Sequence, residues 1–257
     1  KKMIRLVKAE AKKIFYYKSF MACTILYLVF LPLMFIGIGQ LSISKTAISL
    51  SIIFNYPDLW HNLSYLASWF NLLLGIMFIL LISNEFVYKT LRQNVIDGVS
   101  RNQLILSKFI VILIIAFLST FYILLSGLLI GEIYAVKHSF DDILKESYFL
   151  ITYFIQSVAY MSLGLLVGML FRRQGTPILF FLLYTVMIEP IVSLKIPAPF
   201  NDYMPMNILG NLVNNPLPGM IVTTLPHLDL TTTIIGSITY IILFVILSLV
   251  LVKKIDL

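Results

Sequence analysis

Uncharged stretches long enough to cross a bilayer dominate the hydrophobic pattern of the chain. A spanning helix needs about 20 apolar residues, because the hydrocarbon core is roughly 30 Å thick. Five runs reach that length without a charged residue: 19–44, 62–84, 109–131, 147–171 and 230–252. A sixth run, 174–194, holds one charge, Glu189, which Pro190 follows. The pattern predicts six spans, of which 174–194 is the shortest.

The spans are predicted to be helices. They lack the alternation of a strand, and lipid offers no hydrogen-bond partner to an open backbone. Pro32 lies inside the first run and predicts a kink there. The expected fold is therefore an all-α polytopic membrane bundle, a single transmembrane domain over residues 1–257.

Residues 1–18 show a second pattern, that of an amphipathic helix. Apolar side chains recur on one face, and Lys and Arg fill the other faces; the apolar set is Ile4, Val7, Ala11, Ile14 and Phe15. This pattern predicts a helix in the membrane interface. The alternative is a solvated basic tail.

The loop 85–108 between the second and third spans is predicted to be structured. Two helical stretches break at Asp97-Gly98, where glycine permits a sharp turn. Ser100 and Gln103 have the spacing of a capping box, so a capped helix is expected to lead into the third span. The segment 195–229 holds six of the ten prolines, and we expect short helices there between spans five and six. The Gly127/Gly131 and Gly164/Gly168 pairs favour close packing within the bundle.

Composition supports lipid as the solvent. Hydrophobic residues make up 60% of the chain and charged residues 12%, whereas a soluble domain has about 25% charged residues. The net charge is +7, and 15 of the 19 Lys and Arg residues fall on one side of the six-span layout. That asymmetry predicts that both termini are cytoplasmic and that the basic residues meet anionic lipid. Nucleic-acid binding is excluded because no reading motif accompanies the charge.

Several kinds of chemistry lack their motifs. The chain has no phosphate-binding G-x-x-x-x-G-K-[ST] and no H-E-x-x-H, and its one cysteine, Cys23, has no partner. The three histidines, His61, His138 and His227, are scattered in predicted external segments. We therefore expect no catalytic, cofactor or metal site in this chain. An intramembrane enzyme stays an alternative, but it lacks a histidine and clustered acids at membrane depth.

Two glutamates need separate interpretation. Glu189 is the one ionisable residue inside a predicted span, so it is a candidate functional residue and the basis of an alternative, an ion-coupled carrier. It is otherwise the point where the fifth span leaves the hydrocarbon. Glu85, at the end of the second span, has Lys89 and Arg92 within one to two helical turns, where pairing is possible.

The loop sequence carries a resemblance to a family. Asn84-Glu85-Phe-Val-Tyr-Lys-Thr-Leu-Arg-Gln-Asn-Val-Ile-Asp-Gly-Val-Ser-Arg101, followed by Lys108, resembles the corresponding stretch of permease subunits of type-2 ABC exporters. That family typically shows an acidic residue, a Thr/Leu/Arg stretch, a Gly-x-Ser-Arg turn and an opening Lys. Many members have Gly before the Thr, where this chain has Lys89. The plan of six spans extends the resemblance over nearly the whole chain.

The resemblance implies a mechanism and partners. Two permease chains, identical or sibling, would form the path in a bacterial cytoplasmic membrane, and two cytosolic ATPase subunits would bind ATP and Mg²⁺ beneath them. The loop 85–108 would be the coupling element, braced by the helix 1–18, and this chain itself would not be an enzyme. The expected coupling residues are Glu85, Arg92, Val95, Asp97, Gly98, Ser100 and Arg101.

Overall fold

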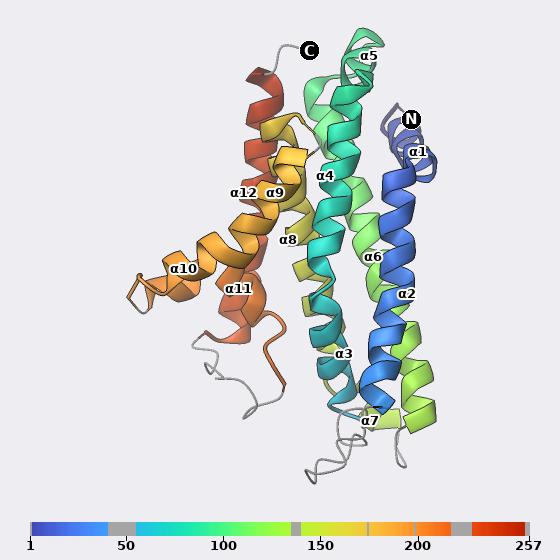
Figure 1. The fold of residues 1–257 in the computed structure, drawn as a ribbon, viewed down its shortest axis with the longest axis vertical. Coiled ribbons are helices and arrows are strands. Elements are labelled where there is room, and N and C mark those ends of the chain that lie inside the picture. Colours follow the sequence, from blue (N-terminus) through green and yellow to red (C-terminus); the bar gives the residue numbers. More distant parts are fainter. Residues whose placement is uncertain are drawn as a thin grey trace.

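The protein is helical wherever its structure is described, with no strand in those ranges. The computed structural model describes residues 2–40, 55–134, 140–173, 175–197, 199–216 and 228–254. The elements in chain order (Figure 1) are α1 (Lys2–Tyr16), α2 (Lys18–Gln40), α3 (Leu59–Ser68), α4 (Asn71–Val87), α5 (Thr90–Ile96), α6 (Arg101–Tyr134), α7 (Phe140–Leu144), α8 (Tyr148–Phe171), α9 (Gly175–Leu183), η2 (Tyr184–Ile188), α10 (Glu189–Ser193), η3 (Phe200–Tyr203), α11 (Pro205–Asn211) and α12 (Leu230–Lys254). The predicted all-α class is confirmed over these residues.

The helices make the chain a multi-pass membrane protein. Within the described ranges, five helical segments are long and apolar enough to cross a membrane: 18–37, 101–133, 141–171, 175–193 and 230–254. The predicted span 62–84 is instead a pair of helices, α3 and α4, that meet at a bend of 41°. Counting that pair as one broken span gives six.

The bundle has two distinct ends. Figure 1 shows α1, α5 and the last turn of α12 together at one end, which we name the terminal end, and α3, α7 and α11 toward the other, the opposite end. The α6 helix begins at Arg101, eight residues before the predicted span, because the capped helix of the loop runs straight into it. Part of the predicted segment 195–229 forms η3 and α11, and residues 198 and 217–227 of it lie outside the described ranges.

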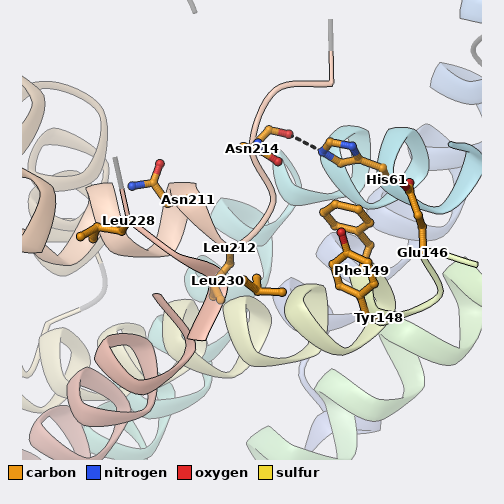
Figure 2. Close-up of a pocket in the computed structure, with 9 residues that line it drawn as sticks. All are labelled: His61, Glu146, Tyr148, Phe149, Asn211, Leu212, Asn214, Leu228 and Leu230. Carbon is orange, nitrogen blue, oxygen red and sulfur yellow. Dashed lines mark hydrogen bonds between the residues drawn. The ribbon is translucent and has the colours of Figure 1, made fainter. Parts of the chain in front are cut away.

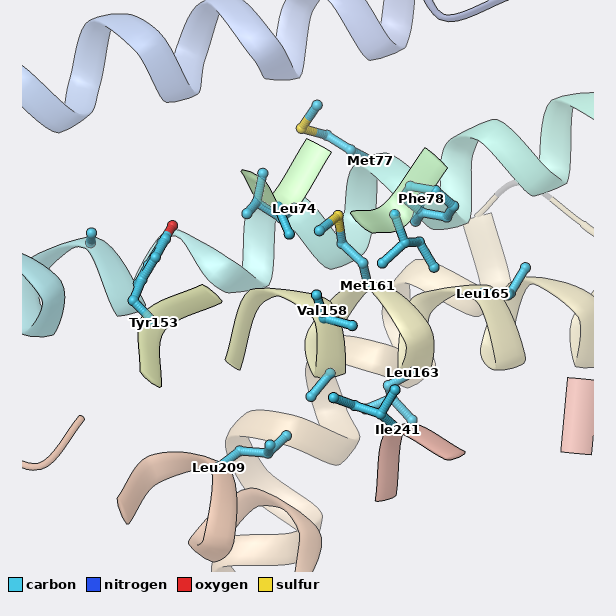
Figure 3. Close-up of a cluster of buried hydrophobic side chains, with 14 of the residues drawn as sticks. Leu74, Met77, Phe78, Tyr153, Val158, Met161, Leu163, Leu165, Leu209 and Ile241 are labelled. Carbon is cyan, nitrogen blue, oxygen red and sulfur yellow. The ribbon is translucent and has the colours of Figure 1, made fainter. Parts of the chain in front are cut away.

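The centre of the bundle is α8. In its most apolar stretch 67% of the residues are buried, against no more than 28% in the other four spanning segments. Side chains of α4 and α8 interdigitate along their length, and Leu209 of α11 and Ile241 of α12 close the other side of α8 (Figure 3). The outer helices therefore keep wide apolar faces that need lipid or a partner to cover them.

Small residues let α4 and α8 approach closely. A Cβ added to Gly164 would lie 2.5 Å from the backbone oxygen of Gly75, so the two backbones touch there. A Cβ on Gly168 would lie 3.0 Å from the Cβ of Ile82. The predicted packing of this glycine pair within the bundle is thus confirmed, and it accounts for glycine in the middle of a long helix.

Hydrogen bonds hold the bend between α3 and α4 against α8. The Asn71 side chain donates to Gln156 Oε1 (2.9 Å) and accepts from Ser157 Oγ (2.8 Å). Gln156 in turn donates to the backbone oxygen of Leu209 (2.8 Å), at the end of α11. These buried polar groups satisfy one another, and they fasten the short helix α11 to the middle of the bundle.

The fifth span carries an irregular turn before Glu189. Residues 184–188 form a π-turn, and the N–H of Glu189 closes it on the oxygen of Tyr184. The helix then continues to Ser193, so Glu189 and Pro190 lie within the helical segment, directly after the irregular turn. Proline supplies no N–H to a regular helical ladder, and a wider turn accommodates that loss. Figure 1 shows α9 and α10 leaning away from the rest of the bundle.

Candidate functional site

Four charged side chains form a closed ring at the terminal end of the bundle. Lys13 Nζ donates to Glu10 Oε1 (3.0 Å) and to Glu85 Oε1 (2.9 Å). Lys108 Nζ donates to Glu10 Oε2 (3.2 Å) and forms an ion pair with Glu85 Oε2. Each lysine thus meets both glutamates. We name Glu10, Lys13, Glu85 and Lys108 the charge ring; it joins α1, α4 and α6.

The ring is buried because its members lie on the apolar faces of their helices. Glu10 falls between Val7 and Ile14, which pack against the core, and Lys108 continues the buried stripe of Leu104, Ile105 and Val111. The side chains of Glu85 and Lys108 have no exposed surface, and that of Glu10 is 1% exposed. A charge in that position is stable only when it is paired, and two carboxylates with two ammonium groups leave no net charge.

The electrostatics of α1 follow from this pairing. Burial raises the pKa of Glu10, but the ammonium groups of Lys108 and Lys13 outweigh burial and bring that pKa down to about 2. Burial lowers the pKa of Lys13, but the carboxylates of Glu85 and Glu10 more than offset it and raise that pKa above its ordinary value. Both groups are therefore charged across the physiological range.

Glu85 does not pair with the two basic residues that follow it in sequence, although their spacing predicts that this pairing is possible. Its carboxylate contacts Lys13 and Lys108 rather than Lys89 and Arg92. Glu10, Lys13 and Lys108 were not among the expected site residues. A charge at the spacing of an apolar face, as at Glu10 and Lys108, is the signal that could have found them.

Beyond the ring, the chain forms a helix, a turn and a capped helix. Leu91 of α5 is buried and anchors the segment, while Val95 is half-buried and Arg92 and Asp97 are exposed. Gly98 has a left-handed φ of 80°. Ser100 N–H donates to Gln103 Oε1 (3.1 Å), and Gln103 N–H donates to Ser100 Oγ (3.3 Å). The predicted turn and capping box are confirmed.

Arg101 ties this segment to the end of the last helix. Its Nη1 donates to the backbone oxygens of Val252 (3.2 Å) and Lys253 (2.7 Å) of α12. The final carbonyls of a helix have no partner within it, and a guanidinium beside them also meets the negative end of the helix dipole. The segment from α5 to the following turn is therefore connected at both of its ends to α1, α4, α6 and α12. Its exposed residues include Arg92, Ile96, Asp97, Gly98 and Ser100. We name this surface the α5 surface.

Comparison with known families gives one match over most of the chain. Residues 54–257 match a family described as Protein of unknown function (DUF2705). The chain belongs to the DUF2705 family. A search of curated proteins found no match.

The matched region of this DUF2705 chain divides the charge ring. It contains Glu85 and Lys108, together with the whole α5 surface, and it begins after α1. The ring is thus built half from the family region and half from the helix that precedes it.

Lys89 occupies an uncommon backbone position. Its φ is 54°, in the left-handed region that glycine adopts most readily. The residue directly precedes α5 as its N-cap, where it lets the chain turn sharply after α4. Tyr88 beside it stacks on Tyr17, with ring centroids 6.1 Å apart, and this contact adds a second tie between the N-terminal helices and the end of α4.

Glu189 of the DUF2705 chain lies far from the ring, and its contacts are structural. Its carboxylate accepts a hydrogen bond from the backbone N–H of Met206, in the first turn of α11. Its other oxygen, Oε2, is buried and has no hydrogen-bond partner among the described residues. A carboxylate at a helix N-terminus satisfies donors that the helix leaves unpaired. Within the described residues, no group of three His, Cys, Asp or Glu side chains could hold a metal ion.

Proposed function

We propose that this chain is the membrane-spanning permease subunit of an ATP-binding cassette exporter and that the α5 surface docks on a separate cytosolic ATPase. The observation that carries the proposal is the construction of the terminal end. Glu85 near the end of α4, just before α5, is joined to α1 and α6 by the charge ring, and Arg101, just after the turn, is joined to α12. A displacement of α5 would therefore be transmitted to α1, α4, α6 and α12 together. A coupling element needs that kind of rigid connection.

Lys89 gives this proposal additional support. At the position where many of the resembling permeases have glycine, this chain has a lysine in the left-handed conformation. The departure in sequence therefore keeps the backbone path that glycine would allow. In the proposed assembly both termini are cytoplasmic, two copies of the ATPase lie beneath two permease chains, and ATP and Mg²⁺ are bound by the ATPases alone.

Lipid and a second permease chain are the proposed partners of the wide apolar faces. Leu33 on α2, Val186 on η2 and Ile246 on α12 are each more than half exposed in the single chain. An ion-coupled carrier would need Glu189 as its working group. One oxygen of that carboxylate accepts from the start of α11, and the other, Oε2, is buried without a hydrogen-bond partner among the described residues.

Co-purification from the native membrane tests the proposal. The tagged chain should bring down an ATP-hydrolysing subunit in equal amount. Ile96→Asn is the sharpest variant, because Ile96 is 68% exposed on the α5 surface and its loss leaves the core unchanged. We expect at least tenfold weaker ATPase association. Phe200→Asn, at an equally exposed apolar residue of η3, is the matched control and should keep full association. A chain that purifies alone under mild conditions contradicts the proposal.

A further inference from the structure

A cavity of about 320 Å³ lies at the opposite end of the bundle. It forms where α3, the start of α8, the chain after α11 and the start of α12 meet (Figure 2). His61, Glu146, Tyr148 and Phe149 line it, together with the two asparagines 211 and 214 and several leucines. We name it the Glu146 cavity. The charge ring and the proposed coupling function do not involve it.

Aromatic rings build one wall of this cavity in a fixed geometry. The His61 ring lies parallel to the Phe149 ring, with centroids 3.9 Å apart, and Tyr148 stacks on Phe149 at 4.4 Å. His61 Nε2 is 2.8 Å from the backbone oxygen of Asn214. A carbonyl only accepts, so Nε2 carries the hydrogen and a neutral His61 keeps Nδ1 as an acceptor.

The backbone of Glu146 is in the left-handed conformation, which is unfavourable for a residue with a side chain. Its φ is 58°, where an L-residue with a side chain is strained, and glycine or asparagine would be the easier choice. Its Oε2 is shielded from solvent and has no hydrogen-bond partner among the described residues. The neighbouring Lys145 pairs with Asp142 instead (2.9 Å). Strain and an unsatisfied buried oxygen at one residue point to a ligand.

The lining selects the sign of that ligand. Among the described residues it holds one carboxylate and no Lys or Arg, and the ring of Tyr148 attracts cations. We propose that the Glu146 cavity binds a small primary ammonium compound. The ammonium group donates to the Glu146 carboxylate and lies against the ring of Tyr148. The volume corresponds to on the order of ten water molecules, so the ligand has a comparable number of heavy atoms.

An alternative interpretation is that the Glu146 carboxylate interacts favourably with the positive end of the α8 dipole, because Glu146 directly precedes Ser147, the N-cap of that helix. The two readings differ in their consequences. A dipole partner stabilises the protein and has no affinity for amines. A ligand group has affinity for amines and is itself dispensable for folding.

Tryptophan fluorescence of the purified full chain can follow binding. The indole of Trp60 donates to the backbone oxygen of Ile143 (2.6 Å), three residues before Glu146, and a Trp69→Phe background isolates its signal. Three probes of similar size separate charge from size: ethanolamine, glycolate and ethylene glycol. We expect a saturable response to ethanolamine, with a dissociation constant on the order of 1 mM, and none to the other two.

Variants connect that response to the carboxylate. Glu146→Gln should weaken ethanolamine binding at least tenfold, while Asp142→Asn, at a neighbouring carboxylate paired with Lys145, should leave it unchanged. Glu146→Gly should abolish binding and raise Tm, because glycine relieves the left-handed strain. The proposal is overturned if all three probes act alike, if Glu146→Gln binds as the parent does, or if Glu146→Gly lowers Tm.

Discussion

Carboxylates are used in opposite ways at the two ends of the bundle. At the terminal end, two carboxylates and two ammonium groups close a ring in which every charge has two partners. At the opposite end, the carboxylate of Glu146 keeps one buried oxygen without a partner, on a strained backbone beside a cavity. Full pairing fixes three helices together, whereas incomplete pairing leaves a capacity for binding. The difference separates a structural use of charge from a recognition use within one chain.

Removal of Glu85 should give the largest effect. Glu85→Ala leaves Lys108 buried with only half of its partners, and losing one member of a buried ion pair costs roughly 3–5 kcal/mol of stability. A thermal melt in detergent measures this loss. The double variant Glu85→Leu with Lys108→Met removes one charge of each sign and should recover most of it. If the single variant melts like Asp142→Ala, a change in a solvent-exposed ion pair, the ring does not fix the three helices together.

The second-largest effect is expected from acidification, which should weaken the attachment of α1 to the bundle. The pKa of Glu10 is lowered from 4.5 to about 2, so its stabilising contribution is complete above pH 4.5 and is lost as pH falls toward 2. The full contribution is about 3 kcal/mol. The pKa of Lys13 is raised, so its contribution is complete below pH 10.5 and is lost at higher pH. Hydrogen exchange of the α1 amides, corrected for intrinsic rates, should show protection falling below pH 4.5.

Glu10→Gln is the control for that profile. The variant should lose protection of α1 already at neutral pH and should show a flat profile between pH 4.5 and 3. A parent chain whose α1 protection does not change down to pH 3 would show that the ring adds little to the attachment of α1.

Replacement of Glu189 should have the smallest effect on stability. It discriminates best between the two uses of a carboxylate, because Glu189 could serve either structure or recognition. As a cap of α11, its replacement by Ala should cost about 0.5–2 kcal/mol and increase hydrogen exchange in α11 and little elsewhere. Glu189→Gln keeps an acceptor for Met206 N–H and should recover most of that loss. Complete loss of function in a stable Glu189→Gln variant would move this residue into the recognition class and revive the carrier.

The parts of the fold that depend on local chemistry could be predicted from the sequence. Apolar run length follows from bilayer thickness, which is why 147–171 and 230–252 agree with α8 and α12 within two residues. The Ser100–Gln103 capping box and the turn at Gly98 are equally local. The bend between α3 and α4 was missed, because it depends on Asn71 meeting Gln156 and Ser157, 85 and 86 residues away.

The charge ring could not be derived because its distances along the chain are long. Glu85 is 72 residues from Lys13, and Glu10 is 98 from Lys108, while Lys89 and Arg92 stood closer in sequence. Only the docking of α1 decides between those partners. The Glu146 cavity depends in the same way on four segments that converge, and a left-handed glutamate has no signature in the sequence.

The left-handed Lys89 has a consequence for how relatives of this chain are detected. Glycine, asparagine or lysine can each follow the same backbone path there, at costs that differ by no more than about 1–2 kcal/mol. Evolution can therefore exchange the residue while the turn persists. A sequence signature that demands glycine before Thr90 would pass over such chains, whereas a signature written in backbone angles would retain them.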